Sequence, residues 1–237
     1  MPTILRFVGT SLNFFPLIQR RTSQYLGMKV LITAGPTVEP IDPVRYLSNH
    51  SSGKMGYAIA TAAVDEGFEV ILVTGPTDID LPDGVTMISV RTALEMEAAV
   101  KDYLPSCDAG VFTAAVSDYR VAEYSDQKMK KVVGQETLTL ELVKNPDILA
   151  GARDYFDGVL IGFAAETEQV VENAREKLQR KRVDVIVAND VSREDIGFGS
   201  DENQVSLVYA DDVVELDLMS KDEVGIQIVG VLQELQQ

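Results

Sequence analysis

The chain has 237 residues, of which 46% are hydrophobic and 24% charged, so its composition is that of a globular protein and not of a disordered or collagen-like chain. Its 21 Lys and Arg and 37 Asp and Glu give a net charge of −16, which disfavours nucleic acid and anionic membranes as partners. The single cysteine, Cys107, excludes an intrachain disulfide, and the single histidine, His50, excludes metal sites that need two. No run of about 18 apolar residues predicts a membrane-spanning helix.

Residues 1–27 differ in composition from the rest, because they contain three arginines and no acidic residue. They could form a targeting peptide, but polar residues and a proline interrupt the apolar region and no small-residue cleavage motif follows. Met28 directly precedes a strand-like run. We therefore expect a domain over residues 28–237, preceded by an extension of uncertain status that a misassigned start would explain.

From Met28 onward, apolar runs of strand length alternate with helical patterns. Alternation of this kind, with strands that are apolar throughout, predicts a parallel sheet covered on both faces. The fold expected is one three-layer α/β/α Rossmann-like domain. The predicted strands are 29–34, 69–74, 85–90, 108–114, 158–163 and 183–188, and the predicted helices are 53–66, 93–104, 146–154, 167–181 and 220–235.

Helix boundaries are marked by side chains that cap free backbone groups. The predicted caps are Gly67 after the first helix, Thr92 with Glu95, Asn145 before Pro146, and Ser220 with Glu223.

Two segments depart from the alternation. Residues 118–144 have no helical pattern but contain LTLELV, so we expect a strand-and-loop excursion from the main fold. Residues 190–219 predict a loop and then two short strands around a turn at 210–212.

In open α/β sheets, ligands bind beyond the carboxyl ends of the strands, so the loop after the first strand is a candidate site. It contains small residues up to Gly53 at a predicted helix start, where backbone N–H groups favour an anion. The loop matches neither a Walker A motif, because Met55 follows Lys54, nor the G-x-G-x-x-G fingerprint. A capped helix with small residues for close packing explains the loop equally well, and a structural role explains His50 better than catalysis.

Clustered lysines stand out in so acidic a chain. Three of the four residues 128–131 are lysines, which indicates a cationic flap over phosphates or simply a solvated turn. Lys177 and Lys181 share one helical face and could hold a triphosphate or merely complement the helix dipole. The start of helix 146–154, after Lys144, could hold an anion.

Tyr124 and Lys128 match the Tyr-x-x-x-Lys spacing of short-chain dehydrogenases. The surrounding pattern does not fit that family, because the residues lie in the excursion and the glycine-rich first turn is missing.

Seven motifs together resemble one family, phosphopantothenate–cysteine ligase (phosphopantothenoylcysteine synthetase) of bacterial coenzyme A synthesis. In this order they cover nearly the whole chain from Met28, which makes their joint specificity high. The motifs are ITAGPTVEPIDPVRYLSNHSSGKMG (32–56), TALEM (92–96), AAVSDYR (114–120), KMKK (128–131), KNPDI (144–148), GFAAET (162–167) and ANDV (188–191).

The resemblance implies a two-step ligation. The carboxylate of 4′-phosphopantothenate attacks the α-phosphate of a nucleoside triphosphate, and the amine of L-cysteine then attacks the acyl-nucleotide. The bacterial family typically uses CTP, so we expect CTP, with Mg²⁺ implied by the triphosphate and its protein ligands unknown. Because both first substrates are anions, positioning and charge neutralisation should dominate catalysis.

The same resemblance implies roles for individual residues. Lys128 would contact the triphosphate at the reacting α-phosphate, Asn49 would bind the acyl-nucleotide during cysteine attack, and Arg45 would support the phosphopantothenate site. Lys177 and Lys181 would hold the phosphates. The base and ribose would be held by Phe112, Thr113, Ala114, Asp118, Pro146, Asp147, Ile148, Leu149 and Phe163.

Many bacterial members follow a flavin-dependent decarboxylase domain, which 27 residues cannot hold, so a stand-alone ligase without flavin is expected. The family is generally dimeric, with the partner helping to complete the active site, and we expect a cytoplasmic homodimer. Two alternatives remain: a Rossmann-like nucleotide-binding oxidoreductase without ligase activity, and a non-enzymatic regulatory homologue, against which the presence of both Asn49 and Lys128 argues.

Overall fold

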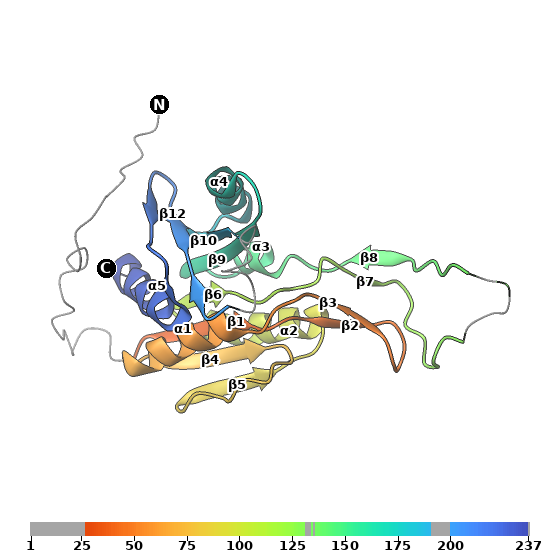
Figure 1. Cartoon of the computed structure of the whole chain (residues 1–237). Helices are drawn as coiled ribbons and strands as arrows, with labels where there is room; N and C mark the ends of the chain where they lie inside the picture. Colours follow the sequence, from red (N-terminus) through yellow and green to blue (C-terminus); the bar gives the residue numbers. More distant parts are fainter. Residues whose placement is uncertain (1–26, 131–133, 135, 191–199, 237) are drawn as a thin grey trace.

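The computed structural model describes residues 27–130, 134, 136–190 and 200–236, and its centre is an eight-stranded sheet (Figure 1). The strand order is β13-β12-β10-β9-β6-β1-β4-β5; β12 and β13 are antiparallel and the others are parallel, as the sequence predicts. The bounds are β1 (Lys29–Ala34), β4 (Glu69–Thr74), β5 (Val85–Ser89), β6 (Ala109–Phe112), β9 (Val159–Glu166), β10 (Val185–Asp190), β12 (Val205–Val208) and β13 (Val213–Glu215).

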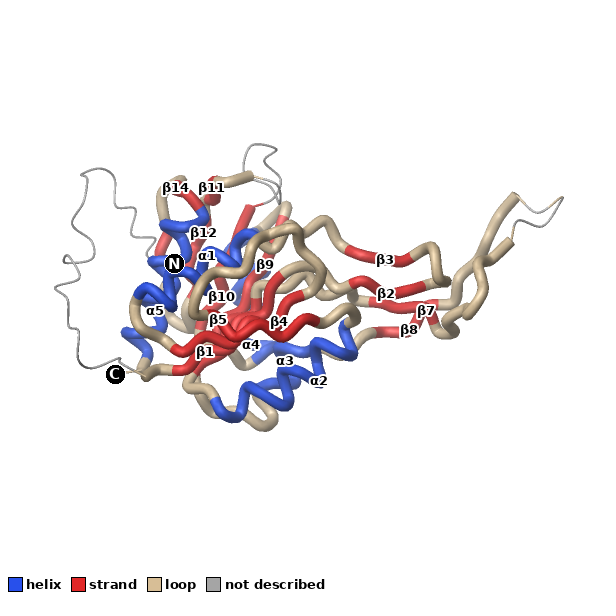
Figure 2. Tube along the Cα trace, turned by 90° about the horizontal axis from the view of Figure 1, so that it is seen from below, coloured by secondary structure: helices blue, strands red, loops and turns tan. Residues whose placement is uncertain are grey.

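Helices cover both faces of this sheet, which confirms the predicted three layers (Figure 2). On one face lie α1 (Lys54–Asp65) and α5 (Lys221–Leu235). On the other lie α2 (Ala93–Tyr103), a 3₁₀ turn η1 (Leu104–Ser106), α3 (Ile148–Ala152) and α4 (Val170–Lys181).

The central strand β1 shows how the sequence produces two cores. Because successive strand residues point to opposite faces, Val30 and Ile32 pack with α1 and α5, whereas Leu31 packs with α2. All three side chains are fully buried, and each contributes about 1.5–3 kcal/mol relative to an exposed position. This double burial explains why β1 reads as a continuous apolar run.

Two antiparallel strand pairs extend away from the sheet (Figures 1 and 2). They are β2 (Val38–Pro40) with β3 (Tyr46–Ser48), and β7 (Tyr119–Val121) with β8 (Leu142–Lys144). Strand β2 lies against β7. We call the described residues of 38–48 and 119–144 the arm. A last small pair, β11 (Glu202–Asn203) with β14 (Met219–Ser220), precedes α5.

Several predicted local features are confirmed. Thr92 with Glu95 and Ser220 with Glu223 form complete capping boxes. Gly67 ends α1 with a φ of +84°. The strand pair in 118–144 and the hairpin around 210–212 are both present.

Other predictions are wrong in detail. Asn145 does not cap α3; the cap is Asp147, whose side chain accepts from the Ala150 N–H at 3.2 Å, so the helix is shorter than the predicted 146–154. The Asn145 amide instead donates to the Ser117 carbonyl at 2.8 Å, a long-range contact that sequence spacing does not reveal. The β2–β3 pair was not predicted, and of LTLELV only Leu142 and Val143 belong to a strand.

Some predictions lie outside the described residues. They concern the extension at 1–26, Lys131 and Val191, and the domain start at Met28 stays a prediction. Within the described part of the chain, no helix is long and apolar enough to cross a membrane.

Candidate active site

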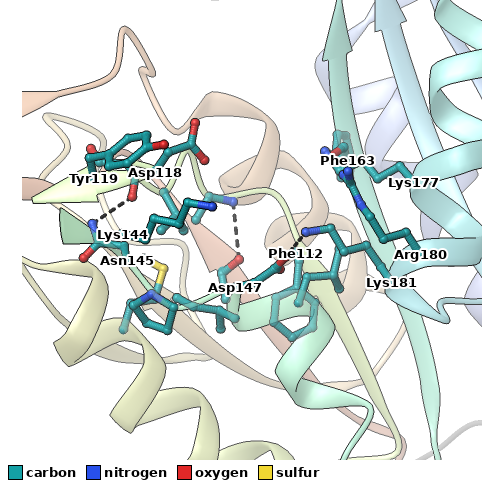
Figure 3. A pocket seen from close by; sticks show the side chains of 18 residues that line it. Phe112, Asp118, Tyr119, Lys144, Asn145, Asp147, Phe163, Lys177, Arg180 and Lys181 are labelled. Carbon is teal, nitrogen blue, oxygen red and sulfur yellow. Dashed lines mark hydrogen bonds and ion pairs between the residues drawn. The ribbon is translucent and has the colours of Figure 1, made fainter. Parts of the chain in front are cut away.

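A pocket of about 640 Å³ lies beyond the carboxyl ends of β1, β6 and β9 (Figure 3). This is the edge at which parallel sheets bind ligands and where the sequence predicted the site. Its lining residues are Thr33, Met96, Phe112, Ala114, Val116, Ser117, Asp118, Tyr119, Lys144, Asn145, Pro146, Asp147, Ile148, Leu149, Phe163, Lys177, Arg180 and Lys181.

One part of the pocket wall is apolar. Phe112 ends β6, Phe163 lies in β9, and Ile148 and Leu149 begin α3. Gly162 permits this packing, since a Cβ there would lie 2.6 Å from Leu149 Cδ2. Rings and aliphatic side chains of this kind suit a flat heterocycle such as a nucleotide base.

The pocket is also lined by cations from α4: Lys177, Arg180 and Lys181, which lie beside Phe163 (Figure 3). The Lys177 ammonium donates to the Phe163 carbonyl at 2.7 Å. Burial, followed by the charge of Lys181, lowers the pKa of Lys177 below its ordinary value. Helical spacing thus brings positive groups to one side of the pocket, as the sequence predicted.

Asp147 faces these cations and forms an ion pair with Lys181. Burial raises the pKa of the Asp147 carboxyl, but the hydrogen bonds from Lys181 and from the Ala150 N–H outweigh burial and hold the pKa below its ordinary value. The Asp147 side chain already accepts from one N–H group at the start of α3, that of Ala150, and the anion site predicted there stays a prediction.

Asn145 joins the segment after β8 to the segment at the start of β7. Its backbone N–H donates to the Asp118 carbonyl at 2.8 Å, and its side-chain oxygen accepts from Arg120 Nη1 at 3.1 Å. Arg120 also donates to the Lys144 carbonyl at 2.7 Å. These bonds hold the start of β7 and the end of β8 together, and with them Asp118 and Lys144.

The pocket brings together ten of the residues predicted to bind nucleotide. Thr113 is not among the lining residues; its hydroxyl donates to the Thr33 carbonyl at 2.6 Å and fastens β6 to β1. The ten are Phe112, Ala114, Asp118, Pro146, Asp147, Ile148, Leu149, Phe163, Lys177 and Lys181.

The three residues predicted to be catalytic do not line this pocket. Asn49 is nearest, because its amide donates at 3.1 Å to the carbonyl of Ala115, between two lining residues. Arg45 and Lys128 lie on the arm, where Arg45 contacts Asp42 and Met129 and Lys128 is exposed. Their roles stay predictions.

Some lining residues were missed. Arg180 directly precedes Lys181, and Tyr119 and Lys144 lie inside motifs already recognised, so position in a motif could have identified them. The carboxylates that line the pocket are Asp118 and Asp147. In the part of the chain that the structure describes, no group of three or more His, Cys, Asp or Glu side chains could hold a metal ion.

Fold and pocket define an α/β protein of the Rossmann-like class, with a candidate ligand site at the carboxyl ends of a mainly parallel sheet. Residues 25–235 match the family described as DNA/pantothenate metabolism flavoprotein C-terminal domain, and the chain belongs to this family.

Similar proteins agree with this membership. The chain is 49% identical over 201 residues to the coenzyme A biosynthesis bifunctional protein CoaBC of Escherichia coli, covering 84% of this chain and 50% of that protein. It is 46% identical over 211 residues to CoaBC of Vibrio parahaemolyticus, covering 88% and 53%. The chain thus spans about half the length of these relatives.

Among solved structures, the C-terminal domain of a CoaBC protein aligns with a TM-score of 0.75 and 42% identity. The alignment covers 88% of this chain and 96% of that domain.

Proposed function

We propose that the chain is a phosphopantothenate–cysteine ligase, which joins 4′-phosphopantothenate and L-cysteine at the expense of a nucleoside triphosphate. Family membership and the CoaBC relatives support a role in coenzyme A biosynthesis. The observation that carries the proposal is the pocket, which combines an apolar wall with Lys177, Arg180 and Lys181 in a chain of net charge −16.

In the first step, a carboxylate oxygen of 4′-phosphopantothenate bonds to the α-phosphorus of the nucleotide. The bond from that phosphorus to the bridging oxygen breaks, and pyrophosphate leaves. Both reactants are anions, so the step needs positive groups that offset their repulsion and hold them in line. The α4 cations and Lys128 are the groups proposed for this task.

In the second step, the cysteine amine attacks the acyl carbon, the bond to the nucleoside monophosphate breaks, and the amine loses a proton. We assign Asn49 to this step, since its side chain lies beside the pocket wall at Ala115. An amide can hold the acyl-nucleotide by hydrogen bonds without adding negative charge.

The nucleotide proposed is CTP, with its base against Phe112, Leu149 and Phe163 and its phosphates toward α4. Mg²⁺ would neutralise triphosphate charge, and hard oxygen ligands suit it. Of the two lining carboxylates, Asp118 is exposed and fits such a contact, whereas Asp147 is paired with Lys181.

We propose a homodimer formed through the arm. Large hydrophobic side chains are exposed along it, among them Val44 and Tyr46, each more than half exposed. Clustered exposed apolar groups mark protein–protein contacts. The arm also carries Arg45 and Lys128, so a partner chain bound to this surface would lie next to two of the predicted catalytic residues.

The test is pyrophosphate release with a panel of CTP, ATP, GTP and UTP. We expect release that requires 4′-phosphopantothenate and is fastest with CTP, and amide formation that also requires cysteine. No release by the folded protein, or release that needs NAD(P) or flavin, would reject the ligase and favour the oxidoreductase alternative. Fastest release with ATP would overturn the choice of CTP alone.

A further inference from the structure

The turn between β2 and β3 contains a carboxylate, Asp42, whose side chain is fully buried. A buried carboxylate is costly unless hydrogen bonds satisfy it. Oδ1 of Asp42 accepts from the backbone N–H groups of Val44 and Arg45, both at 2.8 Å. This oxygen therefore closes the local turn.

The second oxygen of Asp42 serves a distant part of the chain. Oδ2 accepts from the Met129 N–H at 3.1 Å and from Arg45 Nη1 at 2.8 Å. The Arg45 guanidinium in turn donates to the Met129 carbonyl, with both terminal nitrogens at 3.3 Å. Asp42 and Arg45 thus hold both polar groups of Met129, more than 80 residues away.

Met129 directly follows Lys128. The hydrogen bonds to the Met129 N–H and carbonyl therefore fix the backbone next to Lys128. A further bond, from the Ser125 N–H to the Ile41 carbonyl at 3.1 Å, attaches the same segment three residues earlier. The Lys128 side chain itself is exposed. The exposed Lys128 ammonium thus belongs to a backbone segment whose position is set by the buried carboxylate of Asp42.

We infer that Asp42 is a positioning residue for the ligation: through Oδ2 and Arg45 it holds the Met129 backbone and thereby presents Lys128 to the triphosphate. The inference rests on the proposed function, because that function gives Lys128 its ligand. It adds a residue that makes no contact with substrate and acts only through its neighbours.

Because the two carboxylate oxygens of Asp42 have different partners, Asp42→Asn tests the role of Oδ2 while keeping that of Oδ1. An asparagine keeps Oδ1 to close the turn, as asparagine does in many turns. It replaces Oδ2 by an NH₂ group, which is a donor and so faces two donors, the Met129 N–H and Arg45. The variant should fold, yet release the Lys128 segment. Asp126→Asn, an exposed carboxylate two residues before Lys128, is the matched control for the lost charge.

We would measure binding of CTP and of cytidine, which has no phosphate, by titration calorimetry, together with hydrogen exchange at the Met129 amide. Asp42→Asn should weaken CTP binding about tenfold, leave cytidine binding unchanged and speed the exchange, while Asp126→Asn changes neither affinity. In a Lys128→Gln background, Asp42→Asn should weaken CTP binding no further, because its effect passes through Lys128.

Other results would overturn the positioning role: unchanged CTP binding in Asp42→Asn, an equal loss for CTP and cytidine, or the same loss repeated in the Lys128→Gln background. A parent chain that binds no CTP would reject the nucleotide proposal. In that case, unchanged exchange in Asp42→Asn would reject the role of Asp42 as well, whereas faster exchange would show that Asp42 anchors the Lys128 segment.

Discussion

At the scale of single residues, the pocket places like charges side by side on α4. Lys177 and Lys181 stand one turn apart, and Arg180 lies between them in the sequence. Repulsion between such groups is offset by the Phe163 carbonyl, which accepts from Lys177, and by Asp147, which pairs with Lys181. Both lysines thus have a partner that a phosphate of the proposed nucleotide would supplement or replace.

Asn49→Asp should separate the two steps of the ligation. The new carboxylate cannot donate to the Ala115 carbonyl and places negative charge next to the acyl-nucleotide. Pyrophosphate release should therefore persist for one turnover, while amide formation falls at least about a hundredfold and the acyl-nucleotide accumulates. Quenched-flow chromatography would detect the intermediate. Full turnover at the parent rate would remove Asn49 from the mechanism.

Asp147 should affect stability in acid. Its pKa in the folded protein lies below the ordinary value of 3.8. Its contribution to stability is consequently complete above pH 3.8 and is lost as the pH falls through the folded-state pKa. The free energy of unfolding of the parent chain should thus fall more steeply than that of Asp147→Asn as the pH drops below about 4. Urea unfolding at stepped pH measures both slopes, and parallel curves would contradict the assignment.

At the scale of secondary structure, hydrophobic periodicity was sufficient for the sheet and the long helices. Strands such as β1 are buried on both faces, so their apolar runs identify them regardless of neighbours. The β2–β3 pair was missed because it carries Pro40 and Pro43 and exposed or polar residues, which suppress a strand signal. The predicted Asn145 cap was wrong because the Asn145 side chain instead donates to the carbonyl of Ser117, which is distant in the sequence.

Two glycines in α5 give a matched test of helix packing. A Cβ on Gly225 would lie 2.9 Å from the Ala58 carbonyl oxygen of α1, whereas one on Gly230 would meet nothing within 4 Å. Gly225→Ala should therefore lower the free energy of unfolding by about 1–3 kcal/mol. Gly230→Ala should raise it by about 1 kcal/mol, because alanine favours a helix. Urea denaturation of both variants provides the comparison, and equal effects would show that α1 and α5 adjust freely.

At the scale of the whole molecule, the arm is the part whose position in the fold the sequence predicted least well. Motifs located the pocket residues because these residues follow parallel strands, whose ends meet by topology. Arg45 and Lys128 depend instead on how two hairpins extend from the sheet, and on any partner that covers them. Local sequence spacing encodes neither the course of the hairpins nor a partner. The motifs therefore identified Arg45 and Lys128 without predicting their positions in the fold.

The arm yields a prediction about assembly. Tyr46→Ser removes an aromatic ring that is more than half exposed, and it should shift the proposed dimer toward monomer. Leu81→Ser, an exposed residue away from the arm, is the control. Sedimentation velocity over a dilution series measures the shift, and specific activity should fall at the same concentrations at which the dimer dissociates. An unchanged sedimentation profile would place the interface elsewhere or reject it.

The ion pair between Asp147 and Lys181 has a consequence for the energetics of occupancy. A phosphate that binds Lys181 would displace the Asp147 carboxylate. Binding of the proposed nucleotide would therefore exchange one counter-ion of the lysine for another. The displaced acid would then lie beside the incoming anion, and a divalent cation on the nucleotide would relieve that proximity. Under the proposed function, the pocket should therefore favour a nucleotide that arrives with its metal over the bare polyanion.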